Sequence, residues 1–289
     1  MSSQDKPCQS LPPPPLPLDA EYRISSEESI MLKRVIGIRD DNELKEHLLS
    51  IQAEAYAVGR QMAYALFKIV KHPAYESVIR LGKEREKAIF LDLACCVGSD
   101  SRIIIADGYP LENVIGTLDT NFSRRLLKHF LFHFSKVIFF DPNFLQLGVP
   151  ALDTSSQVVD SPPSLTDLTS LTPLQHRISV IYASSFFHLF GEDEQFKLAH
   201  LFASLLSPLP GSIIFGSHNG APEGDKPGRI RASTRGNSGF GHSPASWKEL
   251  WTDKNGPFSP EQVVVQVEAL IAIYGALQGA DCDRGETRK

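Results

Sequence analysis

Hydrophobic and polar positions follow two different periods along this chain. The pattern of residues 21–85 is largely helical. Between residues 40 and 60, apolar side chains recur every three to four residues, which predicts a helix. Asp40 or Asp41 is the predicted N-cap of this helix. From residue 87 onward, short apolar runs alternate with amphipathic stretches, and each run predicts a buried strand. The predicted strands cover residues 87–94, 113–119, 136–140, 177–185 and 211–220. Strands that alternate with helices indicate an α/β fold with a doubly wound, mostly parallel sheet.

The helices between these strands carry recognisable ends. The apolar stretch that follows the first strand predicts a short helix that closes at Gly108. A later helix has Ser243 as its predicted N-cap and Pro244 at its first position. Trp247 and Trp251 lie four residues apart on this helix, which predicts a stripe that faces the core.

The remaining stretches set the domain organisation. We expect loops in the Pro-rich stretch 141–176 and in the Gly/Arg-rich stretch 221–241, whereas residues 263–271 alternate as a late strand would. The expected organisation is a disordered Pro-rich tail at 1–19, an N-terminal helical cap at 20–85 and a sheet domain at 86–280.

Composition and charge limit the classes of partner that we expect for this protein. With 42% hydrophobic residues the chain can bury a full core, and its net charge of −5 is spread without a basic stripe, so we expect no nucleic-acid partner. No apolar run is long enough to predict a membrane span, and the N-terminus lacks the apolar region of a secretory signal. We therefore expect a cytoplasmic protein that acts on a small molecule, and a homodimer is compatible with this sequence.

The stretch "LDLACCVGSDS" at residues 91–101 ends the first predicted strand, where ligands of such sheets bind. A dinucleotide needs several glycines for its pyrophosphate, and this turn has only Gly98. An NAD-dependent oxidoreductase is therefore disfavoured. One glycine suffices for a ligand without phosphates, such as S-adenosyl-L-methionine.

Three acids near this turn have different expected uses. Asp119 ends the second predicted strand, 21 residues after Gly98, and is either the partner of a ribose or the N-cap of the next helix. Asp92 lies inside an apolar strand, where a carboxylate needs a hydrogen bond or a cation, so we expect it near the ammonium of the ligand. Asp100 begins the next helix, where its charge favours the helix dipole.

The four cysteines, Cys8, Cys95, Cys96 and Cys282, do not form a metal pattern. Adjacent cysteines rarely pair with each other, and no CxxC or nearby histidine completes a zinc set. We expect Cys95 and Cys96 to be small buried residues, with neither a metal nor a disulfide.

Histidines supply the candidate acid–base groups. His188 follows the fourth predicted strand and is either a base or hydrogen-bond donor for the substrate, or a histidine that only packs in the core. His218 and His242, beside the fifth strand and the Gly-rich stretch, are weaker candidates.

The motifs "DLACCVGSD", "IYASSFFHLFGEDEQ", "PGSIIFGSH" and "GHSPASWKELW" together resemble fungal class I S-adenosylmethionine-dependent methyltransferases of secondary-metabolite, notably meroterpenoid, biosynthesis. The resemblance covers roughly residues 35–270. It implies a Rossmann-like class I methyltransferase fold with an N-terminal helical extension. It also implies methyl transfer to a small fungal metabolite, onto a carboxylate in the best-known members.

This resemblance assigns the site residues. His188 is the expected catalytic residue, and no metal is expected. The expected cofactor-binding residues are Asp92, Ala94, Cys95, Gly98, Asp119, Thr120, Asp141, Ala183 and Ser184.

The chain also departs from the family pattern. Ala94 replaces a glycine, "GRQMAYALF" replaces an aromatic segment, and Ile138 stands where an acid would recognise adenine. The lost acid favours a second hypothesis, a catalytically degenerate homologue with an interaction role.

Overall fold

The computed structural model describes residues 24–57, 68–93, 95, 98–119, 136–140, 164–168, 171–221, 228–231 and 238–258. Several sequence predictions lie outside the described residues: the Pro-rich tail, the helix after Asp119 and the late strand at 263–271. The expected cofactor residues Ala94, Thr120 and Asp141 lie outside them as well.

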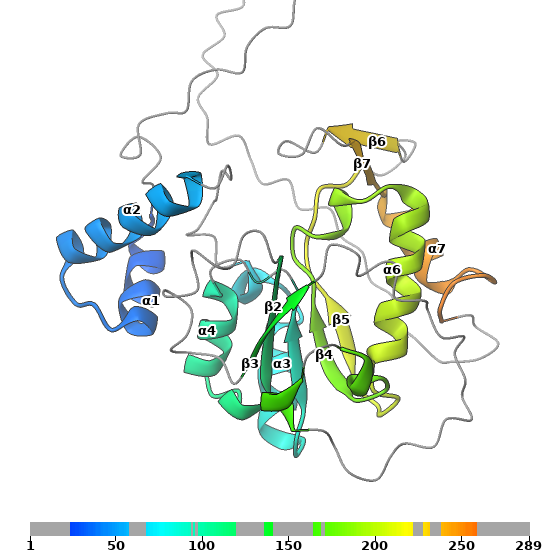
Figure 1. The fold of residues 1–289 in the computed structure, drawn as a ribbon, viewed down its shortest axis with the longest axis horizontal. Helices are drawn as coiled ribbons and strands as arrows, with labels where there is room; N and C mark the ends of the chain where they lie inside the picture. Colours follow the sequence, from blue (N-terminus) through cyan, green and yellow to red (C-terminus); the bar gives the residue numbers. More distant parts are fainter. Residues whose placement is uncertain are drawn as a thin grey trace, which may run out of the picture.

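Five parallel strands form the central sheet of the described chain, in the order β3-β2-β1-β4-β5 (Figure 1). The chain moves outward from β1 through β2 to β3 and then returns to the other side of β1 with β4. Ligands of such sheets bind beyond the carboxyl ends of the strands at this switch point. The α/β fold with a parallel, doubly wound sheet is confirmed, and each of the five strands predicted between residues 87 and 220 contains an observed one. The bounds are β1 Ile89–Asp92, β2 Val114–Asp119, β3 Lys136–Phe140, β4 Ile178–Tyr182 and β5 Ile213–Phe215.

Helices cover both faces of this sheet. In the described chain they are α1 Ser26–Ile36, α2 Asp41–Ala57, α3 Tyr75–Glu84, α4 Ser99–Ala106, α6 Glu192–Leu205 and α7 Pro244–Thr252. Among the residues that the structure describes, there is no helix with the length and apolar character needed to cross a membrane.

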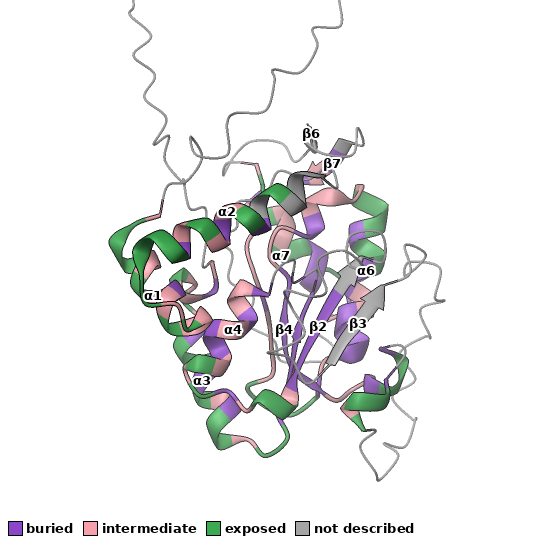
Figure 2. Ribbon diagram, turned by 60° about the vertical axis from the view of Figure 1, so that its left-hand side comes forward, coloured by how far each residue is buried: buried purple, intermediate pink, exposed green. Residues whose placement is uncertain are grey.

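Successive residues of the central strands enter two different hydrophobic clusters. Leu91 and Ile181 pack on the side of α6 and α7, with Phe202 of α6. Phe90 and Val180 pack on the opposite side, with residues of α3 and α4. Every residue of β1 and β4 is buried (Figure 2). Burial on both faces explains why these strands read as continuous apolar runs.

The predicted helix ends are confirmed by hydrogen bonds. Asp40 Oδ1 accepts from the backbone N–H groups of Asn42 and Glu43, each at 2.9 Å, and so caps α2. Ser243 Oγ accepts from the N–H of Ser246 at 3.3 Å, and Pro244 opens α7. Such caps satisfy the free donors of a first helical turn, which is why they can be recognised in a sequence.

The N-terminal helices are attached to the sheet domain by packing and by charge. Helix α1 contacts both α2 and α4, and Leu32 of α1 is buried in the same cluster as α3 and α4. Arg34 of α1 pairs with Asp107, just beyond α4, at 2.8 Å, and the same carboxylate accepts from Tyr75 Oη at 2.5 Å. Helix α1 therefore packs against α4.

The loop predictions need correction. The stretch 221–241 contains an antiparallel hairpin, β6 (Gly228–Arg231) and β7 (Ser238–Gly241), and the stretch 141–176 contains two short 3-10 turns, at 165–167 and 172–174. The hairpin docks on the chain after β4, because the N–H of Phe240 donates to Phe190 O at 2.9 Å. Its glycines and arginines carry no apolar alternation, so the strand signal is absent from the sequence.

Candidate functional site

The turn after β1 is built around one glycine. Cys95 N donates to Thr117 O of β2 at 3.0 Å, and Gly98 N donates to Cys95 O at 2.7 Å. Gly98 has φ 68°, a left-handed conformation that side chains disfavour, and it is the N-cap of α4. The backbone thus turns sharply from the end of β1 into the first turn of α4.

Asp92 is the last residue of β1 and precedes this turn in the chain. The residue is 3% exposed, and Oδ2 accepts a hydrogen bond of 2.5 Å from Ser101 Oγ of α4. Burial raises the pKa of Asp92 well above its usual value, the nearby charge of Asp100 raises it further, and the Ser101 bond opposes both. No ion pair with Asp92 occurs among the described residues. Burial therefore favours the neutral form of this carboxyl group, and a nearby cation would favour its ionised form.

Asp100 is a junction between three segments. Oδ2 accepts from Tyr182 Oη of β4 at 2.8 Å, and Oδ1 accepts at 3.3 Å from the N–H of Ile69, in a short 3-10 turn called η2 (Ile69–Lys71). Burial raises its pKa to about 6, although these hydrogen bonds and the charge of Lys68 lower it. Asp100 does lie in the first turn of α4, as predicted, but its partners come from elsewhere in the fold.

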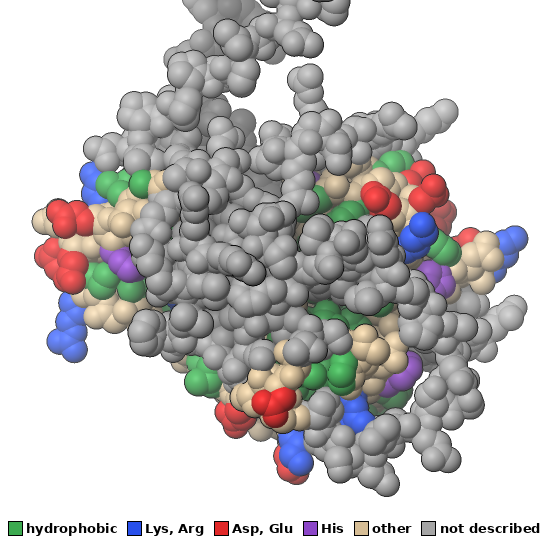
Figure 3. Space-filling view, viewed as in Figure 1, with side chains coloured by type: hydrophobic (Ala, Val, Ile, Leu, Met, Phe, Trp, Pro, Cys, Tyr) green, Lys and Arg blue, Asp and Glu red, His purple; other side chains and the backbone are tan. Residues whose placement is uncertain are grey.

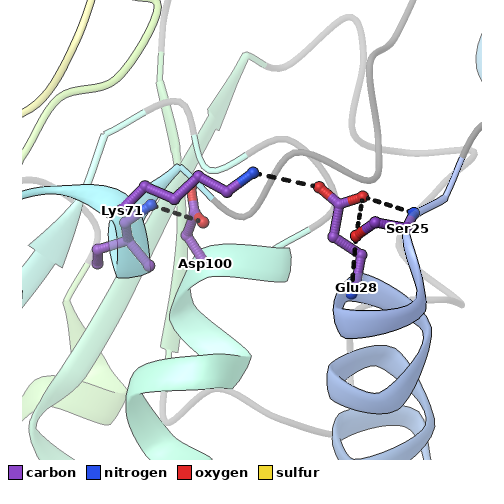
Figure 4. Close-up of polar contacts among 5 residues, drawn as sticks. Ser25, Glu28, Lys71 and Asp100 are labelled. Carbon is purple, nitrogen blue, oxygen red and sulfur yellow. Dashed lines mark hydrogen bonds and ion pairs between the residues drawn. The ribbon is translucent and has the colours of Figure 1, made fainter.

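The same turn η2 reaches the N-terminal helix α1. Figure 4 shows Lys71 directed toward Glu28, 3.4 Å away, while Glu28 accepts from the backbone and the hydroxyl of Ser25. The segment that contacts Asp100 is therefore also bound to the cap of α1.

The carboxyl ends of β4 and β5 lie close together. Ala183 N donates to Phe215 O at 2.9 Å, and Ser184 Oγ lies 3.2 Å from Ser217 Oγ. A Cβ atom added at Gly216 would overlap the carbonyl of Ala183, so only glycine permits this approach. The expected cofactor residues Ala183 and Ser184 thus lie beside the end of β5 as well as that of β4.

His188 lies in a one-turn 3-10 helix, η8 (Phe187–Leu189), and is partly buried. Its Nδ1 accepts from the N–H of Asn219 at 3.4 Å, so the proton resides on Nε2. Burial lowers the pKa of His188, and the charge of Lys68 lowers it further. Near pH 7 the imidazole is a neutral group that can donate from Nε2.

The two weaker histidine candidates lie near His188 in an aromatic wall. The ring of His218 is 4.4 Å from that of Trp247, and the ring of His242 is 5.7 Å from it. Burial lowers the pKa of both histidines to about 4, so the wall is uncharged. Trp251 is 4% exposed and packs in the core as predicted, whereas Trp247 is only partly buried and contacts the histidines.

Lys68 is a site residue that the sequence did not reveal. Its Nζ donates to Ser185 Oγ at 2.5 Å, although the two residues are 117 positions apart. A lysine in a stretch of mixed composition carries no local signal of such a contact.

The structure brings most of the expected residues to one edge of the sheet. Asp92, Cys95 and Gly98 lie at the end of β1, Asp119 is the last residue of the neighbouring β2, and His188 follows β4. Cys95 is buried. Among the described residues, no three His, Cys, Asp or Glu side chains are arranged to hold a metal ion. On the face drawn in Figure 3, the described Lys and Arg side chains do not gather into one patch.

Comparison with known proteins finds fungal methyltransferases whose sequences are similar to this chain. It is 30% identical over 203 residues to the O-methyltransferase phiE of Fungal sp. (strain ATCC 74256), a match that covers 68% of this chain and 60% of phiE. It is 28% identical over 224 residues to the Asnovolin E/Chermesin D methyltransferase nvfJ of Aspergillus novofumigatus, covering 72% and 69%. Methyltransferase adrK of Penicillium rubens is 26% identical over 244 residues, covering 79% and 76%.

Other comparisons are less informative. No family model matches the chain. A solved structure described as PigF with SAH is 14% identical, with a TM-score of 0.36, covering 73% of this chain and 63% of that one. The chain spans less than two thirds of the length of phiE.

Proposed function

The chain is homologous to fungal methyltransferases of secondary metabolism, and on this premise we propose that it transfers a methyl group from S-adenosyl-L-methionine to an oxygen of a small fungal metabolite. The acceptor in this proposal is a carboxylate or a hydroxyl. The observation that carries it is the single-glycine turn at Gly98 beside the buried Asp92, in a chain with these relatives.

The residues at this turn fit the proposed methyl donor. That molecule carries an ammonium and a sulfonium but no phosphate, and it supplies an activated methyl group when bound. Asp92 is a buried carboxyl group with a hydroxyl partner in Ser101, which suits a cation brought near it. Gly98 leaves the backbone of the turn open to a ligand, and Asp119 ends the adjacent strand, where a ribose partner is expected.

The groups after β4 suit an oxygen acceptor. His188 is neutral and can orient a carboxylate through Nε2–H, or accept a proton from a hydroxyl after a change of tautomer. A carboxylate is already nucleophilic, so positioning and exclusion of water are the main requirements for its methylation. The neutral wall of His218, His242 and Trp247 would contact an apolar metabolite.

One observation favours a second candidate. Ile138 occupies the middle of β3, paired with Thr117, where the family resemblance expects an acid for adenine. A homologue that kept the fold but lost the ability to bind the methyl donor would have an interaction role. A cytoplasmic location and a homodimeric assembly remain proposals from the sequence.

Calorimetry with S-adenosylhomocysteine separates the two candidates. Saturable binding supports the methyltransferase, and heat that never exceeds dilution at millimolar ligand supports the degenerate homologue. Binding would then be followed by transfer of a labelled methyl group into acids and phenols extracted from a fungal culture.

A further inference from the structure

Lys68 extends from the N-terminal helical region over the carboxyl edge of the sheet. It directly precedes η2, and its Nζ donates to Ser185 Oγ of the segment after β4 at 2.5 Å. Lys68 is partly buried, and so is its hydrogen bond to Ser185. A cation in that position needs oxygen partners, and an ammonium can donate three hydrogen bonds.

Lys68 lies near a carboxylate that has hydrogen-bond partners of its own. Among the described residues its ammonium forms no ion pair, in contrast to Lys71, which pairs with Glu28 at 3.4 Å. The nearby carboxylate is that of Asp100, and its two oxygens already accept from Tyr182 and from the backbone of Ile69.

The acceptor of the Lys68 hydrogen bond is itself held in an unusual conformation. Ser185 has φ 54°, in the left-handed region that a serine seldom adopts. The conformation is fixed because Ser185 N donates to Ser217 O at 2.6 Å. Backbone strain of this kind concentrates at functional sites.

The groups around Lys68 together suit an anion. His188 is near enough for the lysine charge to lower its pKa, and it is a neutral imidazole with Nε2 available as a donor. Ser185 adds a hydroxyl. A cation, a neutral N–H donor and a hydroxyl at one edge form a set that recognises a planar anion through charge-assisted hydrogen bonds.

We propose that Lys68 binds a carboxylate at the carboxyl ends of β4 and β5, together with Ser185 and His188. This proposal rests on the proposed methyltransferase function. Two sources of the same chemistry exist, the acceptor acid and the methionine portion of the methyl donor. In either case the N-terminal region supplies the charge that fixes one reactant at the edge of the sheet.

The test uses the full-length protein and three variants. Lys68→Met removes the charge, Lys68→Arg keeps it, and Lys71→Met removes a lysine three positions away as the matched control. Thermal unfolding first establishes that all variants fold. Calorimetry then compares S-adenosylhomocysteine with 5′-methylthioadenosine, which keeps the nucleoside and thioether but lacks the carboxylate. Protein saturated with S-adenosylhomocysteine is finally titrated with 1-naphthoate and with 1-naphthamide.

Either of two results supports the proposal. A loss of at least tenfold in S-adenosylhomocysteine affinity for Lys68→Met, with 5′-methylthioadenosine unchanged, identifies the donor carboxylate. If Lys68→Met keeps its affinity for both nucleosides and loses tenfold in affinity for 1-naphthoate but not for 1-naphthamide, the bound carboxylate is that of the acceptor. In both cases Lys68→Arg retains most of the binding.

The proposal is overturned when Lys68→Met binds S-adenosylhomocysteine and naphthoate within twofold of wild type, or when Lys71→Met is impaired equally. Failure of the proposed function looks different, because the wild-type protein itself then binds neither nucleoside.

Discussion

Tyr182 Oη donates a hydrogen bond of 2.8 Å to Oδ2 of Asp100 and so joins the end of β4 to the first turn of α4. The other oxygen of Asp100 accepts from the backbone of Ile69, so the same carboxylate also holds the N-terminal region. One partly buried acid therefore connects the two sides of the switch point with the segment that carries Lys68.

Asp100 should make the stability of the protein depend on pH. Its folded pKa of about 6 exceeds the unfolded value of 3.8, so the folded state binds more protons between these values, and this contribution to stability falls as pH rises from about 4 to 6. Above pH 6 the cost reaches at most about 3 kcal/mol. Asp100→Asn should therefore gain stability relative to wild type as pH rises. Urea unfolding at pH 4.5, 5.5 and 7 measures this, with the exposed Asp193→Asn as control, and parallel curves would contradict the prediction.

Asp92 should make donor binding depend on pH in the opposite sense. Burial raises its pKa, and a bound ammonium favours the ionised form, so binding should release a proton and tighten as pH rises. Asp92→Asn should weaken S-adenosylhomocysteine about 10- to 100-fold, the worth of a charge-assisted bond, and flatten the pH profile. Calorimetry in buffers of different ionisation enthalpy counts the released proton. A wild-type titration that releases none would refute the role.

Asp119 is expected to accept hydrogen bonds from the ribose of the donor. Asp119→Ala should weaken S-adenosylhomocysteine about 10- to 100-fold, because a charge-assisted bond contributes roughly 1.5–3 kcal/mol. Glu112→Ala, an exposed acid just before β2, is the control. Equal affinities of the two variants would mean that Asp119 only ends a strand or caps the next helix.

His188 should matter for turnover, because it follows β4 at the edge of the sheet where the acceptor is expected to bind. His188→Ala should reduce kcat, and His200→Ala on α6 should not. S-adenosylhomocysteine binding should stay unchanged where Lys68 holds the acceptor carboxylate, and should weaken where Lys68 holds the carboxylate of the donor. If the acceptor is a hydroxyl, the rate should fall only below pH 6.5, since the pKa of His188 is lowered. If it is a carboxylate, the rate should stay flat between pH 5.5 and 8. Normal turnover per folded molecule of His188→Ala would show that His188 only packs in the core.

Cys95 and Cys96 should be replaceable. Cys95 is 8% exposed, so replacing both residues with alanine should lower the free energy of unfolding by about 1–2 kcal/mol through lost packing. Metal analysis should find none in either protein. Stoichiometric zinc in purified wild type would overturn the structural role.

The sequence by itself determined the elements whose causes are local. The Asp40 and Ser243 caps are recognisable because a side chain bonds to backbone groups two or three residues away. The strands are recognisable because burial on both faces requires continuous apolar runs, as in β1 and β4. The placement of Asp92 and Gly98 at the site follows from the same logic, since parallel strands present their carboxyl ends at one edge.

Only the tertiary structure decided which distant residues meet. Lys68 reaches Ser185 across 117 positions, and Asp100 meets Tyr182 across 82, because β4 returns beside β1 and η2 packs over their ends. The neutral state of His218 likewise depends on burial among residues of other segments. The hairpin β6–β7 forms against the chain after β4 without any apolar period of its own. These features arise from packing between segments, and no pattern within one segment specifies them.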